Sequence, residues 1–331
     1  MEIKVGIPRG LLYYHYFPLW NRFFETLGAE VVVSQLTNKK IIENGVKHTV
    51  DEACLPVKVY HGHVMDLKDK VDTIFVPRIM SVYKNEYICP KFCGLPEMIT
   101  SSLKDLPPLI DTTINFHKSK KQLYKAIYEI GRPITRNVHQ IEMAYTEGLK
   151  QYQQYKQLMR KGVLPIDILT QKKPETAKRD ILFEQKVILL GHPYNLYDNH
   201  LSMNIIKKLR EKKVKVITPE MMDTATINQY AEQMDKKMFW SFGRKILGTA
   251  FYGMGDPSIS GMIYLSSFGC GLDSVIADIV ERRVRRNSRK PFTILTLDEH
   301  TGEAGIDTRI EAFVDMIKWR EKHENNFSSH G

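Results

Sequence analysis

The chain has 331 residues, of which 43% are apolar and 26% are charged, and its formal net charge at pH 7 is +10. This length exceeds that of one typical core, so two domains are expected, and the composition excludes disordered and fibrous proteins. No apolar run approaches the roughly 20 residues that cross a bilayer, and the first residues have a strand pattern rather than that of a signal peptide. We therefore expect a cytoplasmic protein that does not contact the membrane.

The first third of the chain alternates predicted strands and helices. Apolar residues 3–7 predict a strand, a Pro-Arg-Gly turn follows, and residues 17–27 carry apolar side chains at helical spacing up to Gly28. The alternation continues with predicted strands at 30–33 and 73–76 and predicted helices at 38–48 and 57–68. Strands that alternate with helices in this way indicate a parallel α/β sheet.

The middle of the chain has a different pattern. Residues 119–130 and 138–160 predict two helices, the second polar on most faces, and residues 171–179 have almost nothing to bury. We expect a helical connector over 111–180 that includes an exposed loop.

The strand and helix pattern restarts near residue 186. A strand at 186–190, a helix over 200–212 and a strand at 214–217 follow one another, and further strands are predicted at 262–265 and 292–297. The openings at 3 and 186 resemble each other, since each is an apolar strand, a Gly/Pro turn and aromatic residues that enter a helix. The predicted fold is α/β, with two Rossmann- or flavodoxin-like lobes with parallel sheets, at 1–110 and 181–322, joined by the helical segment and followed by a frayed tail at 323–331.

The net charge of +10 favours anionic partners, and residues 282–290 form the most basic segment. A nucleic-acid interface is disfavoured, because no recognised binding fold or interleaved aromatic pattern accompanies the segment. Two alternatives remain: the solvated end of a helix whose cations face its own negative terminus, or a docking site for a partner or a coenzyme phosphate.

Four cysteines carry the main functional signal: Cys54, Cys89, Cys93 and Cys270. Four in this length are too few for a disulfide scaffold, and in a reducing compartment clustered cysteines indicate metal or redox chemistry. In open α/β sheets ligands bind beyond the carboxyl ends of the strands. Cys89 and Cys93 follow the strand at 73–76 and Cys270 follows that at 262–265, whereas Cys54 lies at a break between helices, from which it can join them.

The local sequence supports ligand roles. Gly269 and Gly271 flank Cys270 and let backbone amides approach a thiolate or sulfide, while Cys89-Pro90 is a step common at cluster ligands. A buried, inert cysteine is the ordinary interpretation of each one alone. Four cysteines in Pro- or Gly-marked loops favour a metal site. Three residues separate Cys89 from Cys93, and the other thiols are distant, which favours an iron–sulfur cluster over a zinc knuckle or a redox dithiol.

Other polar residues fall near the same predicted edge. His61 and His63 lie about 200° apart on one helix, so they cannot both face the site, and ordinary hydrogen-bonded histidines are the competing interpretation. Glu299 and His300 follow a strand end and are candidates for proton transfer. The competing interpretation is that this segment forms only a cap and turn before a helix that begins at 306. Aromatic side chains after the first strand line a pocket or pack the next helix, and these are Tyr13, Tyr14, His15 and Tyr16.

Five motifs occur in a characteristic order: GIPRGL at 6–11, DEACLPVK at 51–58, ICPKF at 88–92, GCGLDS at 269–274 and LDEHTGE at 297–303. Together they resemble the acyl-CoA dehydratase activase-related proteins. These are part of the wider 2-hydroxyacyl-CoA dehydratase family, with 2-hydroxyglutaryl-CoA dehydratase, benzoyl-CoA reductase subunits and double-cubane cluster proteins. The resemblance covers about residues 1–100 and 186–320.

The resemblance implies a [4Fe–4S] cluster held by Cys54, Cys89 and Cys270, with Cys93 as a fourth thiol; the alternative is a double-cubane [8Fe–9S] cluster shared across a dimer. It also implies that the electrons come from an ATP-hydrolysing iron–sulfur activase. The activase would be a separate chain, because this chain lacks a Gly-rich phosphate-binding motif. A CoA ester or other small molecule would be the substrate, and a homodimer or paired subunit the assembly. The chain would then be an oxidoreductase or a lyase-type dehydratase component in reductive or radical dehydration. A non-catalytic electron carrier or partner protein, or a zinc-stabilised binding protein, is the alternative.

Overall fold

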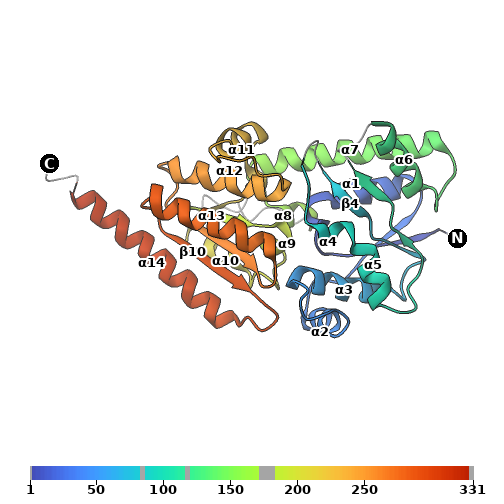
Figure 1. Ribbon diagram of the computed structural model, residues 1–331, viewed down its shortest axis with the longest axis horizontal. Helices are drawn as coiled ribbons and strands as arrows, with labels where there is room; N and C mark the ends of the chain where they lie inside the picture. Colours follow the sequence, from blue (N-terminus) through green and yellow to red (C-terminus); the bar gives the residue numbers. More distant parts are fainter. Residues whose placement is uncertain (1, 83–85, 116–119, 171–182, 328–331) are drawn as a thin grey trace. The chain divides into compact units, whose positions relative to one another are not determined.

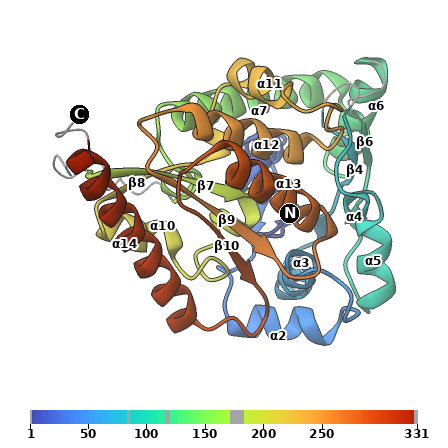
Figure 2. The same cartoon turned by 60° about the vertical axis from the view of Figure 1, so that its left-hand side comes forward.

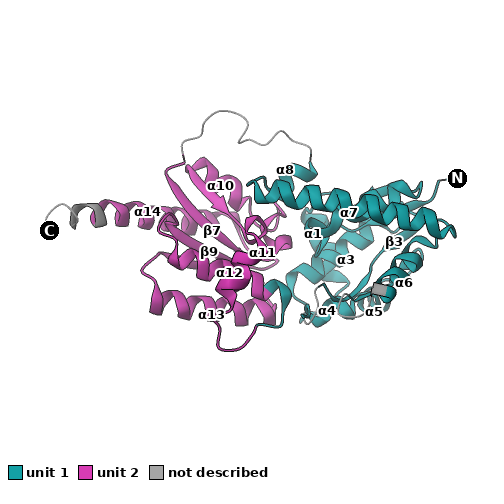
Figure 3. Ribbon diagram, turned by 90° about the horizontal axis from the view of Figure 1, so that it is seen from above, with its two compact units in different colours: residues 1–172, 238–242 teal, residues 173–237, 243–331 magenta. Residues whose placement is uncertain are grey.

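The computed structural model describes residues 2–82, 86–115, 120–170 and 183–327. The chain forms two compact units, which are coloured separately in Figure 3. Unit 1 comprises Met1–Lys172 and Met238–Phe242, and unit 2 comprises Lys173–Lys237 and Gly243–Gly331. The loop expected at 171–179 and the end of the expected frayed tail lie outside the described residues. No helix in the described ranges combines the length and apolarity needed to cross a bilayer.

Unit 1 contains a four-stranded parallel sheet in the order β2-β1-β3-β5. Its strands are β1 (Lys4–Ile7), β2 (Glu30–Val33), β3 (Thr73–Phe75) and β5 (Leu109–Ile110). Val5 at the centre of β1 is paired with Val31 on one side and Thr73 on the other. The short strands β4 (Arg78–Ser81) and β6 (Thr113–Asn115) form a second, two-stranded parallel sheet.

Helices cover both faces of the unit 1 sheet (Figure 1). They are α1 (Tyr13–Thr26), α2 (Lys39–Lys47), α3 (Leu55–Leu67), α4 (Pro90–Cys93), α5 (Leu95–Ser102), α6 (Lys120–Gly131), α7 (Val138–Arg160) and α8 (Pro165–Leu169). α1 packs against α7, where the hydroxyl of Tyr155 donates to the carbonyl of Tyr14 at 2.6 Å. α3 packs on β1, because Leu67 at its end lies against Gly6. The expected helices of the connector thus occur as α6 and α7, which belong to unit 1.

Unit 2 repeats this topology. Its parallel strands are β7 (Gln185–Gly191), β8 (Val214–Ile217), β9 (Gly261–Ser267) and β10 (Phe292–Leu297), in the order β10-β9-β7-β8. In each unit the first strand is central, the second lies on one side of it, and the third and fourth lie on the other. The predicted α/β fold with parallel sheets is therefore confirmed, and the similarity of the two sequence openings extends to the strand order.

The helices of unit 2 lie on two faces of its sheet (Figures 1 and 2). They are α9 (Pro193–Leu196), α10 (Ile205–Glu211), α11 (Thr224–Ala231), α12 (Ser241–Gly255), α13 (Gly271–Asn287) and α14 (Glu303–Phe327), with a 3₁₀ turn η2 (Pro219–Met221). α10 and α14 share one face, where Lys208 pairs with Glu303 and Asp307. α12 and α13 share the other, where the guanidinium of Arg283 lies over the ring of Phe251.

Two local expectations are refined by the structure. The helix expected over 200–212 begins at Ile205, because Met203 and Asn204 before it have positive φ angles of 49° and 55° that no helix accommodates. In the basic segment, Arg282 and Arg285 pair with Asp278 and Glu281 one turn earlier on α13. These pairs fit the interpretation of the segment as a solvated helix end.

Candidate functional site

The order of strands defines one switch point in each sheet, between the first strand and the third. At this point the connections that follow the two neighbouring strands leave the sheet in opposite directions, and a crevice forms beyond the carboxyl ends of the two strands. In unit 1 the switch point lies beyond β1 and β3, and in unit 2 it lies beyond β7 and β9. The residues after these strands are therefore the first place to look for chemistry.

Cys270 lies at the switch point of unit 2. The loop after β9 turns at Gly269, whose φ of +72° favours glycine, and Cys270 then caps the N-terminus of α13. The backbone N–H of Asp273 is directed at the Sγ of Cys270, 3.5 Å away. The thiol is buried. A Cβ on Gly271 would meet nothing within 4 Å, so packing does not require that glycine, and its predicted role beside a cofactor stays a prediction.

A buried polar network surrounds the Cys270 loop, and we call its members the Asp273 network: His192, Asn195, Tyr264, Ser267 and Asp273. The carboxylate of Asp273 accepts from the Tyr264 hydroxyl at 3.0 Å and the Ser267 backbone N–H at 3.1 Å. It also accepts from the Asn195 amide at 3.4 Å, and the Ser267 hydroxyl donates to Asn195 at 2.7 Å. Burial, and then the nearby carboxylate, raises the pKa of Tyr264 well above its ordinary value.

Sequence reasoning missed most of this network. Asp273 is part of the GCGLDS motif, but His192 and Asn195 lie between the strand expected at 186–190 and the helix expected over 200–212 and were not singled out. The available signal was position: both follow β7 directly, and the carboxyl end of a central parallel strand is where functional side chains gather.

Cys54 and Cys89 occupy similar local positions in unit 1. Cys54 is the N-cap residue of α3 and is buried, and Pro56 lies in the first turn of that helix. Cys89 is the N-cap residue of the short helix α4 and is followed by Pro90. Proline suits the first turn because it has no N–H to leave unpaired. Each of the three cysteines predicted as ligands thus precedes a helix, and of the three only Cys270 accepts a cap hydrogen bond from a backbone amide.

Cys93 differs from the other three cysteines. It is the last residue of α4, and its carbonyl oxygen accepts a hydrogen bond from Arg78 at 2.8 Å. Arg78 also pairs with Glu97 on α5. Cys93 lies four residues after Cys89, at the opposite end of the same short helical turn.

The predicted ligand set spans both units, since Cys54, Cys89 and Cys93 belong to unit 1 and Cys270 to unit 2. Within the described residues, no group of three or more His, Cys, Asp or Glu side chains is arranged to hold a metal ion. The chemistry of the donors nevertheless fits a thiolate-held iron–sulfur cluster better than a hard cation, because thiolates are soft ligands. The N–H of Asp273 aimed at Sγ is the kind of contact that supports a cluster ligand.

The two histidines of α3 are held by internal hydrogen bonds. His63 lies between the hydroxyls of Ser34 and Thr37, each 3.0 Å from a ring nitrogen, and burial lowers its pKa to about 3. His61 contacts the carbonyl of Val57 at 2.8 Å, and burial lowers its pKa as well. The ordinary structural interpretation of both residues therefore fits the geometry.

The segment after β10 forms a turn. The Asp298 carboxylate accepts from the backbone N–H of His300 at 2.8 Å and from the Thr301 hydroxyl at 2.9 Å, just before α14 begins at Glu303. The side chain of Glu299 is half-buried and that of His300 is exposed. The geometry matches the cap-and-turn alternative, and proton transfer by Glu299 or His300 stays a prediction.

The aromatic cluster after β1 is divided between two environments. Tyr13 and Tyr16 line a cavity, as the pocket interpretation expected. Tyr14 and His15 instead contact α7, where the hydroxyl of Tyr152 lies 3.1 Å from a ring nitrogen of His15.

The family model described as CoA enzyme activase uncharacterised domain (DUF2229) matches residues 4–222, more than half of the chain. The matched range contains Cys54, Cys89 and Cys93 and ends before Cys270. None of the curated proteins compared with the chain matches it.

Proposed function

We propose, from the premise that this chain belongs to the family of CoA enzyme activase domains, that it is an iron–sulfur protein of an acyl-CoA dehydratase system. In this role it accepts low-potential electrons from a separate ATP-hydrolysing activase. It then delivers them to reductive or radical dehydration of a CoA ester or a related small molecule. The family match makes the chain activase-related; the cluster, the electron transfer and the dehydration are the proposal.

One observation carries the proposal: Cys54, Cys89 and Cys270 each occupy the residue that precedes a helix. Helix N-termini favour negative charge, and a cluster held by thiolates is anionic. Cysteines that only fill a core have no reason to share this position.

The residues of this chain would act as follows. Cys54, Cys89 and Cys270 would bind a [4Fe–4S] cluster as thiolates, and a bound cluster of this kind stores and passes single electrons at low potential. The N–H of Asp273 would neutralise part of the charge on Cys270, and the Asp273 network would fix the loop that carries the thiol. Gly269 would give the turn that exposes these amides.

ATP hydrolysis would take place on another chain. The turns after β1 and β7 read Pro8-Arg9-Gly10 and His192-Pro193-Tyr194, and neither has the Gly-rich loop and lysine that hold nucleotide phosphates. This supports an activase partner.

A second candidate function is non-catalytic electron transfer, and the position of Cys93 favours it. Cys93 lies one helical turn from Cys89, so a fourth thiolate is available beside one of the proposed ligands. A cluster with four protein ligands has no open iron for a substrate, and it would only accept and donate electrons.

Anaerobic purification followed by iron and sulfide analysis, with EPR of the dithionite-reduced protein, tests the proposal. We expect about four irons per chain and a reduced-cluster signal. A double-cubane cluster shared across a dimer gives a similar iron content per chain, so its sulfide ratio and the dimer mass would identify it. Zinc, or no metal after anaerobic reconstitution, would overturn the proposal.

Cysteine variants assign the ligands. Cys54→Ser, Cys89→Ser and Cys270→Ser should each lose most of the bound iron, because each removes one of three thiolates. Cys93→Ser is the matched control and should keep its iron with a changed EPR signal or reduction potential if Cys93 is the fourth ligand. Equal loss at all four positions would contradict the three-plus-one assignment.

A further inference from the structure

A separate cavity lies at the switch point of unit 1. It is about 50 Å³ in volume and is bounded by the loop after β1, by α1, by the end of β3 and by the starts of α4 and α5. Gly10 in this loop brings α3 close, since a Cβ there would lie 3.1 Å from the ring of Tyr60. The cavity is therefore built from segments that the sheet topology gathers at one edge.

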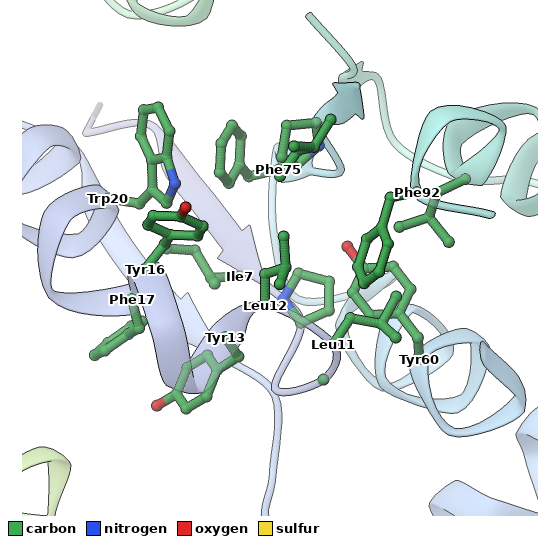
Figure 4. A pocket seen from close by; sticks show the side chains of 15 residues that line it. Ile7, Leu11, Leu12, Tyr13, Tyr16, Phe17, Trp20, Tyr60, Phe75 and Phe92 are labelled. Atoms are coloured by element: carbon green, nitrogen blue, oxygen red, sulfur yellow. The ribbon is translucent and has the colours of Figure 1, made fainter. Parts of the chain in front are cut away.

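The wall of the cavity is almost entirely apolar and aromatic. Figure 4 shows these side chains around the open space, and the labelled ones are Ile7, Leu11, Leu12, Tyr13, Tyr16, Phe17, Trp20, Tyr60, Phe75 and Phe92. None of the described side chains that line the space carries a charge. The guanidinium of nearby Arg9 is held by the Ser34 carbonyl and the Tyr13 hydroxyl. The cavity thus suits a neutral molecule.

Three polar atoms interrupt the apolar wall: the hydroxyls of Tyr16 and Tyr60 and the indole nitrogen of Trp20. Tyr60 is only 5% exposed and Trp20 only 9%, and within the described residues neither side chain is hydrogen-bonded, although neither polar atom is fully enclosed. In Figure 4 the Tyr60 hydroxyl points into the space beside Leu11 and Phe92, and the indole nitrogen of Trp20 lies at the opposite side. Both donors therefore open onto the space, where a ligand acceptor would satisfy them.

The size of the space limits the ligand. A single water-sized sphere needs about 10 to 15 Å³ by this measure, so the cavity holds the equivalent of roughly four waters. Burial raises the pKa of Tyr60 well above its ordinary value, so the hydroxyl remains protonated and donates. An indole N–H can only donate. The matching ligand is compact, apolar and carries an oxygen acceptor.

We propose that this cavity binds a small neutral molecule that consists of one apolar ring or short branched chain and a carbonyl or hydroxyl oxygen, which accepts a hydrogen bond from Tyr60. The apolar body fills the space between Leu12, Phe75 and Trp20. The cavity lies wholly within unit 1, which also carries Cys54, Cys89 and Cys93.

Cyclohexanone and methylenecyclohexane are matched probes, since they share a ring and a heavy-atom count and differ in the oxygen acceptor. Ligand-observed NMR titration of the full-length chain should show that cyclohexanone binds about fivefold more tightly, the factor expected for one neutral hydrogen bond. Tyr60→Phe should abolish this preference while it leaves methylenecyclohexane binding unchanged. Tyr13→Phe is the control, because the Tyr13 hydroxyl bonds Arg9 and points away from the space, and it should retain the preference.

Leu12→Phe provides a second test, because the larger side chain fills the cavity from a half-buried position that tolerates it. Both probes should lose at least tenfold in affinity, with an unchanged circular dichroism spectrum. Absence of cyclohexanone binding to the wild-type chain, or a preference that survives Tyr60→Phe, would overturn the proposal. If Leu12→Phe does not fold, the comparison of Tyr60→Phe with Tyr13→Phe still tests the proposal.

Discussion

The imidazole of His192 and the carboxylate of Asp273 meet inside unit 2, with 3.3 Å between Nε2 and Oδ1. His192 follows β7, and Asp273 lies in the first turn of α13. The same carboxylate binds Tyr264 on β9. One side chain therefore connects two central strands to the helix that begins after Cys270.

Replacement of Asp273 by alanine should lower the free energy of unfolding of unit 2 by about 3–5 kcal/mol, because the buried donors of Tyr264 and Asn195 lose their acceptor. Asp273→Asn keeps the shape and part of the hydrogen bonding, so its loss should be smaller. Urea unfolding followed by circular dichroism measures both. Asp278→Ala removes an exposed partner of Arg282 on the same helix and should cost less than 1 kcal/mol, as surface pairs do. Equal stability of Asp273→Ala and Asp278→Ala would contradict the role of the network.

The fold could be predicted from the sequence because its signals are local. Residues 187–190 form an apolar run that is followed by Gly191, and such a run is typical of a strand buried on both faces. The order of the strands is not local, since no residue of β1 indicates that β2 and β3 lie on opposite sides of it. Only the similarity of the two openings indicated that both units share one topology.

The candidate site was predictable in part for the same reason. Cys270 and Gly269 are adjacent in one motif. A glycine before a cap residue predicts a positive φ angle, and Gly269 has one. His192 follows β7 and Tyr264 lies on β9, and both meet Asp273 only through tertiary packing. Such networks leave no periodic pattern in the sequence, so reasoning from one chain could not assemble them.

Helices α2 and α3 approach each other closely at Gly45 and Gly62, so alanine should have opposite effects there and at an uncrowded glycine. A Cβ on Gly62 would lie 1.9 Å from the carbonyl oxygen of Ile41, so Gly62→Ala should destabilise unit 1 by at least about 3 kcal/mol or prevent folding. Gly305 in α14 has no atom within 4 Å of its Cβ position, so Gly305→Ala should stabilise the helix by about 0.5–1 kcal/mol. Urea unfolding measures both changes. A Gly62→Ala variant as stable as the wild type would show that the helices are not in contact there.

Arg78 restrains the segment that carries Cys93, because it donates to the Cys93 carbonyl and pairs with Glu97. Arg78→Gln should raise the rate at which a thiol reagent modifies Cys93 in the metal-free protein by about tenfold, the factor that loss of one charged hydrogen bond allows. Mass spectrometry of the labelled peptides assigns the rate to Cys93, and buried Cys54 is an internal reference that should not change. Glu97→Gln keeps the bond to Cys93 and should have a smaller effect. Equal rates in Arg78→Gln and the wild type would mean that Arg78 does not restrain this turn.

His63 makes the stability of unit 1 depend on pH. The ring is fully buried between Ser34 and Thr37, and burial lowers its pKa from 6.5 to about 3 in the folded chain. Below pH 6.5 the unfolded chain therefore binds a proton that the folded chain refuses, and stability falls as the pH falls toward 3. Above pH 6.5 both states are neutral at this residue and the effect disappears.

The expected loss from His63 is about 2 kcal/mol between pH 7.5 and pH 5, since each pH unit between the two pKa values contributes up to 1.4 kcal/mol. Urea unfolding at several pH values should show this slope in the wild type. His63→Asn, which keeps polar atoms between the two hydroxyls but does not titrate, should be less stable at pH 7.5 and should lack this part of the slope. Buried His61 is present in both proteins, so its own lowered pKa cancels in the difference. An equal slope in the two proteins would contradict this prediction, because it would mean that protonation of His63 costs no stability. The enclosure of the ring by two hydroxyls and the apolar side of α3 is the reason to expect a cost.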